Sequence, residues 1–279
     1  NPVSGIYLDY YLPKKVDSLM LKIEILENDA VIRTYTSDKP KDFVSWPGGP
    51  SPEIILPNKR GHNRVHWDFR RASIPAVDKV FVYGSYAGSR VAPGNFKIRL
   101  SYGEVQKETQ ITLLPNPNIK ATTADFDAQQ KLLIKIDSAL SNIHSSVNLM
   151  RNVQSQLQFY IKTLKGNQTY APLIEKAETI DKQLVDWEIN LIQPNQKTFQ
   201  DVINFNNKLN AEWMYLKGFV DSEFPKVTQG AKDRFKDLLA KWKIHKNKLT
   251  VLIEDEFSAF EILFKSMEVP ALLIPELID

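Results

Sequence analysis

Cysteine is missing from all 279 residues of this chain. Disulfide bonds, thiolate metal sites and cysteine nucleophiles are therefore excluded. Long apolar runs are missing too: none reaches the roughly 18 residues of a membrane-spanning helix, and no signal-peptide pattern stands at the N-terminus. Because the sequence begins with Asn1 rather than Met, we expect a processed or excised piece of a longer protein.

An excess of charge of one sign is also absent. Lys and Arg number 36 against 33 Asp and Glu, which gives a formal net charge of +3. Proteins that bind nucleic acid through a basic face carry a larger and more clustered positive charge. We therefore expect no nucleic-acid partner, and the 43% hydrophobic content indicates ordinary globular domains.

Few sequence patterns in this chain indicate catalysis or the binding of a metal or cofactor. The sequence contains no glycine-rich phosphate loop, no nucleophile elbow and no zinc-protease motif. His62 and His66 are four residues apart, but in a predicted strand this spacing separates them by about 13 Å and prevents them from sharing a metal. We therefore predict no catalytic residue, no cofactor, no metal site and no enzymatic activity in this chain.

Three other polar positions stand out in the sequence. His245 stands in the seam of a predicted helix, where it could be a buried ligand or switch, but a core-edge histidine with satisfied nitrogens is the favoured interpretation. His144 lies beside another seam and is expected to reach solvent. Asp68 is expected to form simple surface ion pairs with Arg70 and Arg71.

The strongest positive feature is a long amphipathic helix predicted from Thr123 to Lys165, with Thr122 or Thr123 as its N-cap. At 1.5 Å per residue it would be roughly 60 Å long, so it needs packing partners along its whole length. Only Gln154 interrupts its apolar seam, and Gly166 ends it. The seam consists of Leu133, Ile136, Leu140, Ile143, Val147, Met150, Leu157, Ile161 and Leu164.

Three further helices are predicted after it. Their seams span 172–194, 199–220 and a last stretch that starts at Ala231 and drifts in phase after Leu249. Four helices with short connections predict an antiparallel up-down-up-down bundle with two long and two short members. The two short helices would then cover only the half of the two long helices that is farther from the β domain.

The drifted end of the last helix carries Phe257, Phe260 and Phe264. We expect these side chains to pack under the preceding β domain, or under the tail 269–277, and so to fix the two domains relative to each other.

Residues 1–118 show the alternation that is typical of half-buried strands. Asn28 and Asp29 separate two such stretches and predict a hairpin. The stretch 64–70 is the clearest strand, with Trp67 facing the core. Six or seven short strands with regular turn signals predict an immunoglobulin-like β-sandwich, so the chain is expected to be a multidomain β-then-α protein with the helical bundle in residues 119–279.

The strand pair "LKIEILENDAVIRT", the later "GHNRVHWDFR" and "VAPGNFKIRLSYG" resemble the small immunoglobulin-like domains related to the flagellar hook-capping domain. With the "PNP" linker and long helix that follow, the chain is similar to the C-terminal region of large exported Bacteroidetes proteins, the BNR-repeat or sortilin-like glycosyl hydrolases. The resemblance implies a preceding β-propeller, which would be the partner of this region and would carry any hydrolytic activity. It also implies export to the periplasm or cell surface of a Gram-negative bacterium.

The one candidate binding surface is the loop 73–90, which carries Phe81, Tyr83, Tyr86 and Arg90 between glycines. Aromatic and arginine side chains on a loop suit the binding of a sugar or a protein domain, but they could equally cover the edge of the sandwich. Two hypotheses follow: a non-catalytic accessory region that docks on or spaces a propeller, and a free-standing cell-envelope module that binds a glycan or a protein through this loop.

Overall fold

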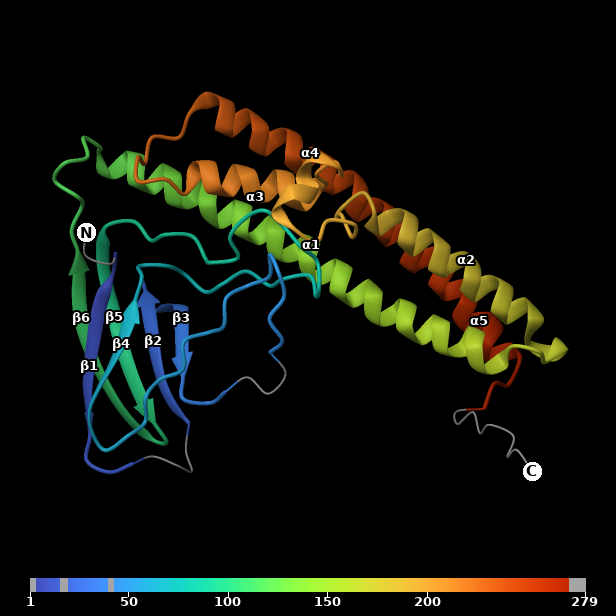
Figure 1. Cartoon of the computed structure of the whole chain (residues 1–279), viewed down its shortest axis with the longest axis horizontal. Helices are drawn as coiled ribbons and strands as arrows, with labels where there is room; N and C mark the ends of the chain where they lie inside the picture. The colour runs from blue at the N-terminus through green and yellow to red at the C-terminus, as the bar shows by residue number, and fades with distance from the viewer. Residues whose placement is uncertain (1–3, 16–19, 40–42, 271–279) are drawn as a thin grey trace.

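The structure, a computed structural model of the chain, describes residues 4–15, 20–39 and 43–270. Within these ranges a β-rich region comes first and four helices follow, as the sequence predicts (Figure 1). The strands are β1 Ile6–Leu12, β2 Leu21–Glu27, β3 Ala30–Thr36, β4 Gly61–Trp67, β5 Gly94–Tyr102 and β6 Val105–Leu113.

The six strands form two antiparallel sheets that enclose one apolar core. β1 pairs with β4, and the second sheet has the order β3-β2-β5-β6. Trp67 lies at the centre of this core, fully buried, with its ring edge-on to those of Phe69 and Phe96. β4 ends at Trp67 instead of continuing to Arg70, because Phe69 adopts a left-handed φ of 59° that breaks the extended backbone.

The predicted hairpin at Asn28 and Asp29 is confirmed. Both residues have positive φ, 49° and 63°, and they connect β2 to β3. Consecutive left-handed residues give a turn whose twist matches that of the two strands, and Asn and Asp tolerate this conformation better than most residues.

The long first helix is confirmed as α1, Thr123–Leu164. The Thr122 hydroxyl accepts a hydrogen bond from the Asp125 N–H, and the Asp125 carboxylate accepts one from the Thr122 N–H, so a capping box starts the helix. Gly166, with φ of 94°, ends it. The remaining helical elements are η1 Gln168–Tyr170, α2 Ala171–Glu188, η2 Phe199–Ile203, α3 Leu209–Val220, α4 Gln229–Val251, η3 Leu252–Phe257 and α5 Ser258–Ser266.

The path of the helices differs from the predicted up-down-up-down bundle. α2 and α3 follow one another along α1 in the same direction, so the short helices cover both halves of α1 and not only its far half (Figure 1). Arg151 of α1 pairs with Glu188 at the end of α2, whereas Gln129 near the start of α1 bonds to the Val220 carbonyl at the end of α3. The layout is a long helix, a broken returning helix and a second long helix.

The break between α2 and α3 is longer than the sequence predicted, because helices were expected over 172–194 and 199–220. α2 ends at Glu188, and Phe199 belongs to the short 3₁₀ helix η2 rather than to α3, which begins only at Leu209. The Asp201 carboxylate accepts the backbone N–H groups of Lys197 and Thr198, which fixes a turn in this segment. Helical periodicity over 199–202 was therefore misleading.

α4, η3 and α5 form one continuous helix, and η3 is a π-helical segment. A π-helical turn contains one extra residue and shifts the phase of all later side chains. This insertion coincides with the point after Leu249 where the predicted seam drifts.

The expected contact between the terminal phenylalanines and the β region is wrong. Phe260 and Phe264 lie at the opposite end of α1, where both rings contact that of Tyr160. Val269 joins this distal cluster, so the beginning of the predicted tail does contact the phenylalanines. Residues 271–277 of the tail lie outside the described residues.

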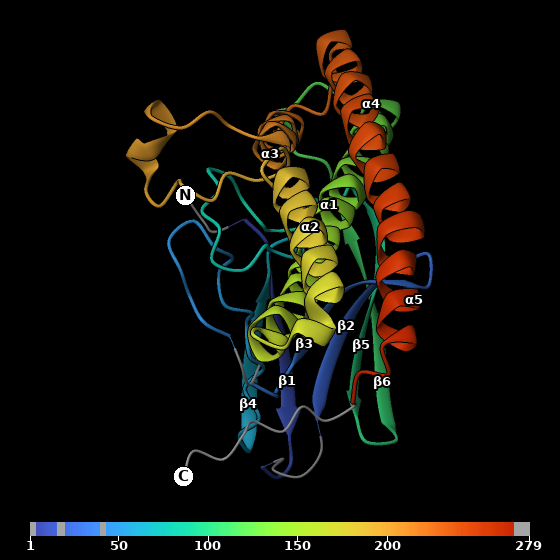
Figure 2. The same cartoon turned by 90° about the vertical axis from the view of Figure 1, so that its right-hand side faces the viewer.

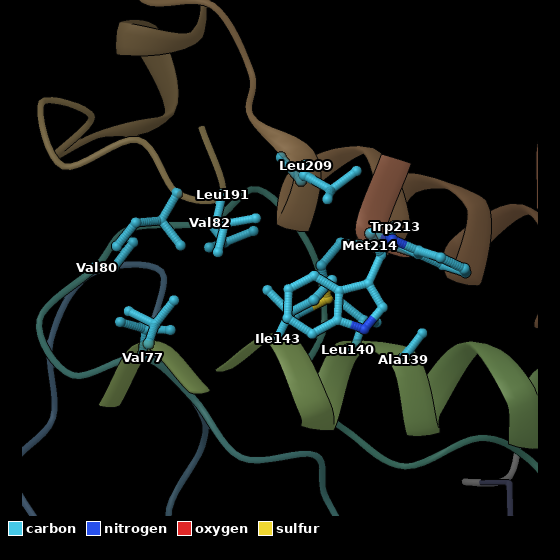
Figure 3. Packing of buried hydrophobic residues seen from close by; sticks show 14 of the residues in the cluster. Val77, Val80, Val82, Ala139, Leu140, Ile143, Leu191, Leu209, Trp213 and Met214 are labelled. Carbon is cyan, nitrogen blue, oxygen red and sulfur yellow. The ribbon is translucent and has the colours of Figure 1, made fainter. Parts of the chain in front are cut away.

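Two large cores thus exist, one between the sheets and one among the helices, but the helical core is not made by helices alone. The segment 71–90, which follows β4, contributes five buried side chains to it. Figure 3 shows three of these, Val77, Val80 and Val82, packed beside α1 and α3. Among the described helices, none combines the length and hydrophobicity needed to cross a bilayer.

Candidate interaction surface

The segment 71–90 is a closed loop whose two ends pair with each other. Arg70 forms an antiparallel bridge with Arg90, and the Ile74 N–H donates to the Tyr86 carbonyl at 2.9 Å. Between these paired ends the tip extends from the β region to the helices. Its apolar side chains are buried there: Ile74, Val77, Val80, Val82 and Tyr86.

One face of α1 binds the backbone of this loop. His144 Nδ1 lies 2.7 Å from the Pro75 carbonyl, Asn148 donates to the Ala76 carbonyl at 2.7 Å, and Arg151 donates to the Asp78 carbonyl at 2.9 Å. Asn148 follows His144 by about one helical turn, and Arg151 follows it by about two, so the three side chains lie on one face of α1. Each of them contacts a different carbonyl of the loop.

His144 is therefore a structural group and not the solvent-facing residue that the sequence predicted. Its side chain is fully buried, and burial lowers its pKa to about 4, an effect that the Pro75 carbonyl opposes and Lys217 assists. A carbonyl only accepts hydrogen bonds, so Nδ1 carries a proton in this contact. The lowered pKa favours the neutral ring, with Nε2 unprotonated. Within the described residues, Nε2 is buried without a hydrogen-bond partner.

A second contact region joins residues 85–90 to α1 and α3 through buried charges. Lys217 of α3 is only 3% exposed; its ammonium donates to the Ala87 carbonyl and lies 3.3 Å from the Asp137 carboxylate. Asp137 also accepts hydrogen bonds from the Ser89 N–H, at 3.0 Å, and from the Ser89 hydroxyl. Burial lowers the pKa of Lys217, while Asp137 opposes that effect.

Arg70 extends this network to the end of α3. Its guanidinium pairs with Asp221 at 2.5 Å and donates to the Gly88 carbonyl at 2.8 Å. The other oxygen of Asp221 accepts the Arg90 N–H at 3.1 Å. Arg70 and Arg71 thus do not pair with Asp68 as predicted: Arg71 pairs with Glu27, and Asp68 accepts the Arg70 N–H instead.

The outer side of the loop forms an exposed aromatic cluster with two other loops. Phe199 is 63% exposed, and its ring stands edge-on to Phe81 and Tyr83 at centroid distances of 5.1 and 5.4 Å. Trp46, from the segment between β3 and β4, donates its indole N–H to the Val80 carbonyl at 2.9 Å. The exposed side chains Tyr83, Phe199 and Ile203, together with the half-buried Trp46, are called the three-loop surface. Figure 2 shows the three loops on one side of the molecule.

The structure separates the four residues that the sequence grouped as a binding surface. Tyr83 is 62% exposed, whereas Phe81 and Tyr86 are buried. Tyr86 packs on His144, and burial raises the pKa of its hydroxyl. Arg90 lies at a separate cleft of about 210 Å³ between the β region and the start of α1, where its guanidinium is 3.6 Å from Glu223.

Phe199 could not be recognised from the sequence, because its apparent helical spacing assigned it to a buried seam. Asp137 and Lys217 were equally hidden, since they look like ordinary helix-surface charges in the sequence. A single lysine within the largely apolar stretch 213–220 is the one signal that could have identified Lys217.

The other histidines that the sequence singled out, and the Asp9 carboxylate, lie apart from this surface. His62 and His66 are on β4, facing Tyr11 and Tyr7 of β1, and the Asp9 carboxylate pairs with Arg64. The backbone carbonyl of His245 accepts the Trp187 indole N–H at 2.9 Å. In the described parts of the chain, no three histidine or carboxylate side chains are grouped so that they could hold a metal.

Comparison with known protein families, curated proteins and solved structures finds no match for this chain.

Proposed function

We propose that this chain is a non-catalytic interaction region of a larger exported protein, and that it holds a neighbouring β-propeller domain at a fixed position. One observation carries the proposal: the segment 71–90 belongs to the β region by sequence and to the helical core by packing. An interface with a buried apolar centre and buried ion pairs opposes independent movement of the two parts. The chain then acts as one rigid body about as long as α1, roughly 60 Å.

We also propose a specific fold class for each part of the chain and a location for the protein. Two antiparallel sheets around one core support an immunoglobulin-like class for the β region. The packing of α2 and α3 along α1 supports a bundle in which these two short helices together act as one returning helix. Location in the periplasm or on the surface of a Gram-negative cell follows from the resemblance to exported propeller proteins.

The three-loop surface is the proposed contact site for the propeller. Tyr83 and Phe199 are both highly exposed, and their rings contact each other edge-on. The loop that carries Tyr83 is anchored on α1, so it also limits the movement of the Phe199 ring that packs against it. Exposed aromatic side chains that are already ordered lose little conformational entropy on binding, and such residues dominate the energetics of many interfaces.

The test begins with the gene upstream of Asn1. If it encodes a propeller, the propeller and this chain are produced as separate polypeptides and their affinity is measured by biolayer interferometry. Tyr83→Ala and Phe199→Ala should each weaken binding by about tenfold or more. Phe159→Ala, which removes a 54% exposed aromatic ring from the distal part of α1, should leave the affinity unchanged. Absence of an upstream propeller, or of any binding to it, would refute the proposal.

A free-standing envelope module that binds a glycan through the same loop is the second candidate. The exposure of Tyr83 and Phe199 favours it, because sugar rings stack on exposed aromatic faces. A glycan array probed with the wild-type chain and with Tyr83→Ala and Phe199→Ala separates the two functions. Glycan binding that both variants lose, without affinity for a propeller, would support the second candidate and not the first.

A further inference from the structure

An open groove of about 530 Å³ lies between α1 and α4, on a part of the helical surface that the proposed function does not use. The two helices diverge here, because α3 packs between them. Apolar side chains and a row of lysines line it: Ala139, Leu239, Trp242, Lys135, Lys243 and Lys246. A complementary ligand would need an apolar ridge flanked by acidic groups.

The far end of the same long helix has that character. α4 carries seven basic and two acidic residues, whereas η3 and α5 together carry four acidic and one basic residue. Glu254 and Asp255 are exposed, and the side chain of Ile262 on α5 is 70% exposed. The helix is thus basic over its first half and acidic over its second.

We infer that two copies of this chain associate through this helix in an antiparallel arrangement, with η3 and α5 of each copy seated at the groove of the other. A two-fold axis near Leu249 would place Lys243 of one copy opposite Asp255 of its partner, because the two residues are each six positions from Leu249. Such an isologous contact forms twice and sets the basic half of each copy against the acidic half of the other. Parallel pairing would instead set like charges together.

Apolar side chains are exposed on both of the surfaces that would meet. Ile134 in the wall of the groove is 42% exposed, and Ile262 of α5 is 70% exposed. The proposed arrangement brings the α5 end of one copy to the groove of the other, so both side chains would be removed from water there. Charge therefore sets the antiparallel direction, and apolar burial supplies the association energy.

Sedimentation equilibrium over a wide concentration series tests the inference. The wild-type chain should approach twice its mass of 32.0 kDa as concentration rises. Reversal of the groove lysines, in Lys243→Glu with Lys246→Glu, should weaken association by about tenfold or more, and so should Glu254→Lys with Asp255→Lys. The chain with all four substitutions should regain it, because each reversed end again meets its complement.

Lys107→Glu with Lys120→Glu makes the same change in net charge at exposed positions away from this helix and should leave the association unchanged. Raising the salt concentration to about 1 M shortens the screening length to about 3 Å and should weaken wild-type association without any substitution. A wild-type chain that stays monomeric, paired reversals without effect, or a fourfold variant that fails to regain association would each overturn the inference.

Discussion

Lys217 of α3 and Asp137 of α1 lie 3.3 Å apart beneath residues 85–89, in a position where neither side chain is freely accessible to water. The pair joins three segments, because the lysine also bonds the Ala87 carbonyl and the aspartate bonds Ser89. A buried ion pair of this kind adds little stability over an apolar pair, but removal of one member leaves the other charged, buried and uncompensated.

Asp137→Ala should accordingly lower the free energy of unfolding by about 3–5 kcal/mol, because Lys217 then loses its counter-ion. Chemical denaturation followed by circular dichroism measures the change. Asp127→Ala, an exposed position on the same helix, should stay within about 0.5 kcal/mol of wild type. The double replacement Asp137→Leu with Lys217→Met should recover part of the loss, and a double variant less stable than Asp137→Ala would contradict the argument.

The stability of the protein should fall as pH is lowered through the range set by His144. Its folded pKa is about 4, below the ordinary value of 6.5, so the unfolded chain binds the proton more tightly. The contribution of the neutral His144 to the free energy of unfolding is fully present above pH 6.5 and is lost progressively between pH 6.5 and pH 4. From pH 7 to pH 5 the free energy of unfolding should fall by about 2 kcal/mol because of this residue.

His144→Gln is the matched variant, since its amide can still donate to the Pro75 carbonyl. The difference in unfolding free energy between wild type and variant, measured at pH 7 and pH 5, isolates this histidine from the carboxylates that also titrate on acidification. Equal pH dependence of the two proteins would show that folding does not lower the pKa of His144.

Two glycine substitutions should have opposite effects. A Cβ atom at Gly88 would lie 2.2 Å from the Ala72 carbonyl oxygen, a backbone atom that cannot move aside cheaply, so Gly88→Ala should destabilise the protein by about 1–3 kcal/mol. Gly218 in α3 has open space around the same position, so Gly218→Ala should stabilise it by about 0.5–1 kcal/mol through helix propensity. Thermal unfolding of both variants checks the signs, and a stable Gly88→Ala protein would mean that residues 71–72 and 88 are not closely packed.

Phe260→Ala should loosen the distal end of the helices and leave the β region unchanged. Its ring is partly buried between Tyr160 and Phe264, so the cost should be about 2 kcal/mol, below the 3–5 kcal/mol of a fully buried phenylalanine. Hydrogen exchange should show faster exchange at the end of α1 and the start of α2, with β5 and β6 unaffected. A comparable increase in exchange in β5 and β6 would instead support the contact between Phe260 and the β region that the sequence suggested.

The sequence by itself determined the features that depend on local interactions. Thr122 and Asp125 specify where α1 begins, Asn28 and Asp29 specify the first hairpin, and apolar periodicity specifies which face of α1 is buried. Each of these signals acts between residues that are close in the chain. Even the phase drift after Leu249 was visible, although only the structure explains it as a π-helical segment.

The tertiary structure alone decided how these elements combine and where the candidate surface lies. The valines at 77, 80 and 82 have no helical or strand periodicity, so their burial depends on α1 and α3, which follow more than forty residues later in the chain. For the same reason the sequence could not show that Tyr83 is exposed while Tyr86 is buried, or that Lys217 meets Asp137. Their environments depend on packing between distant segments, which residue spacing along one segment does not encode.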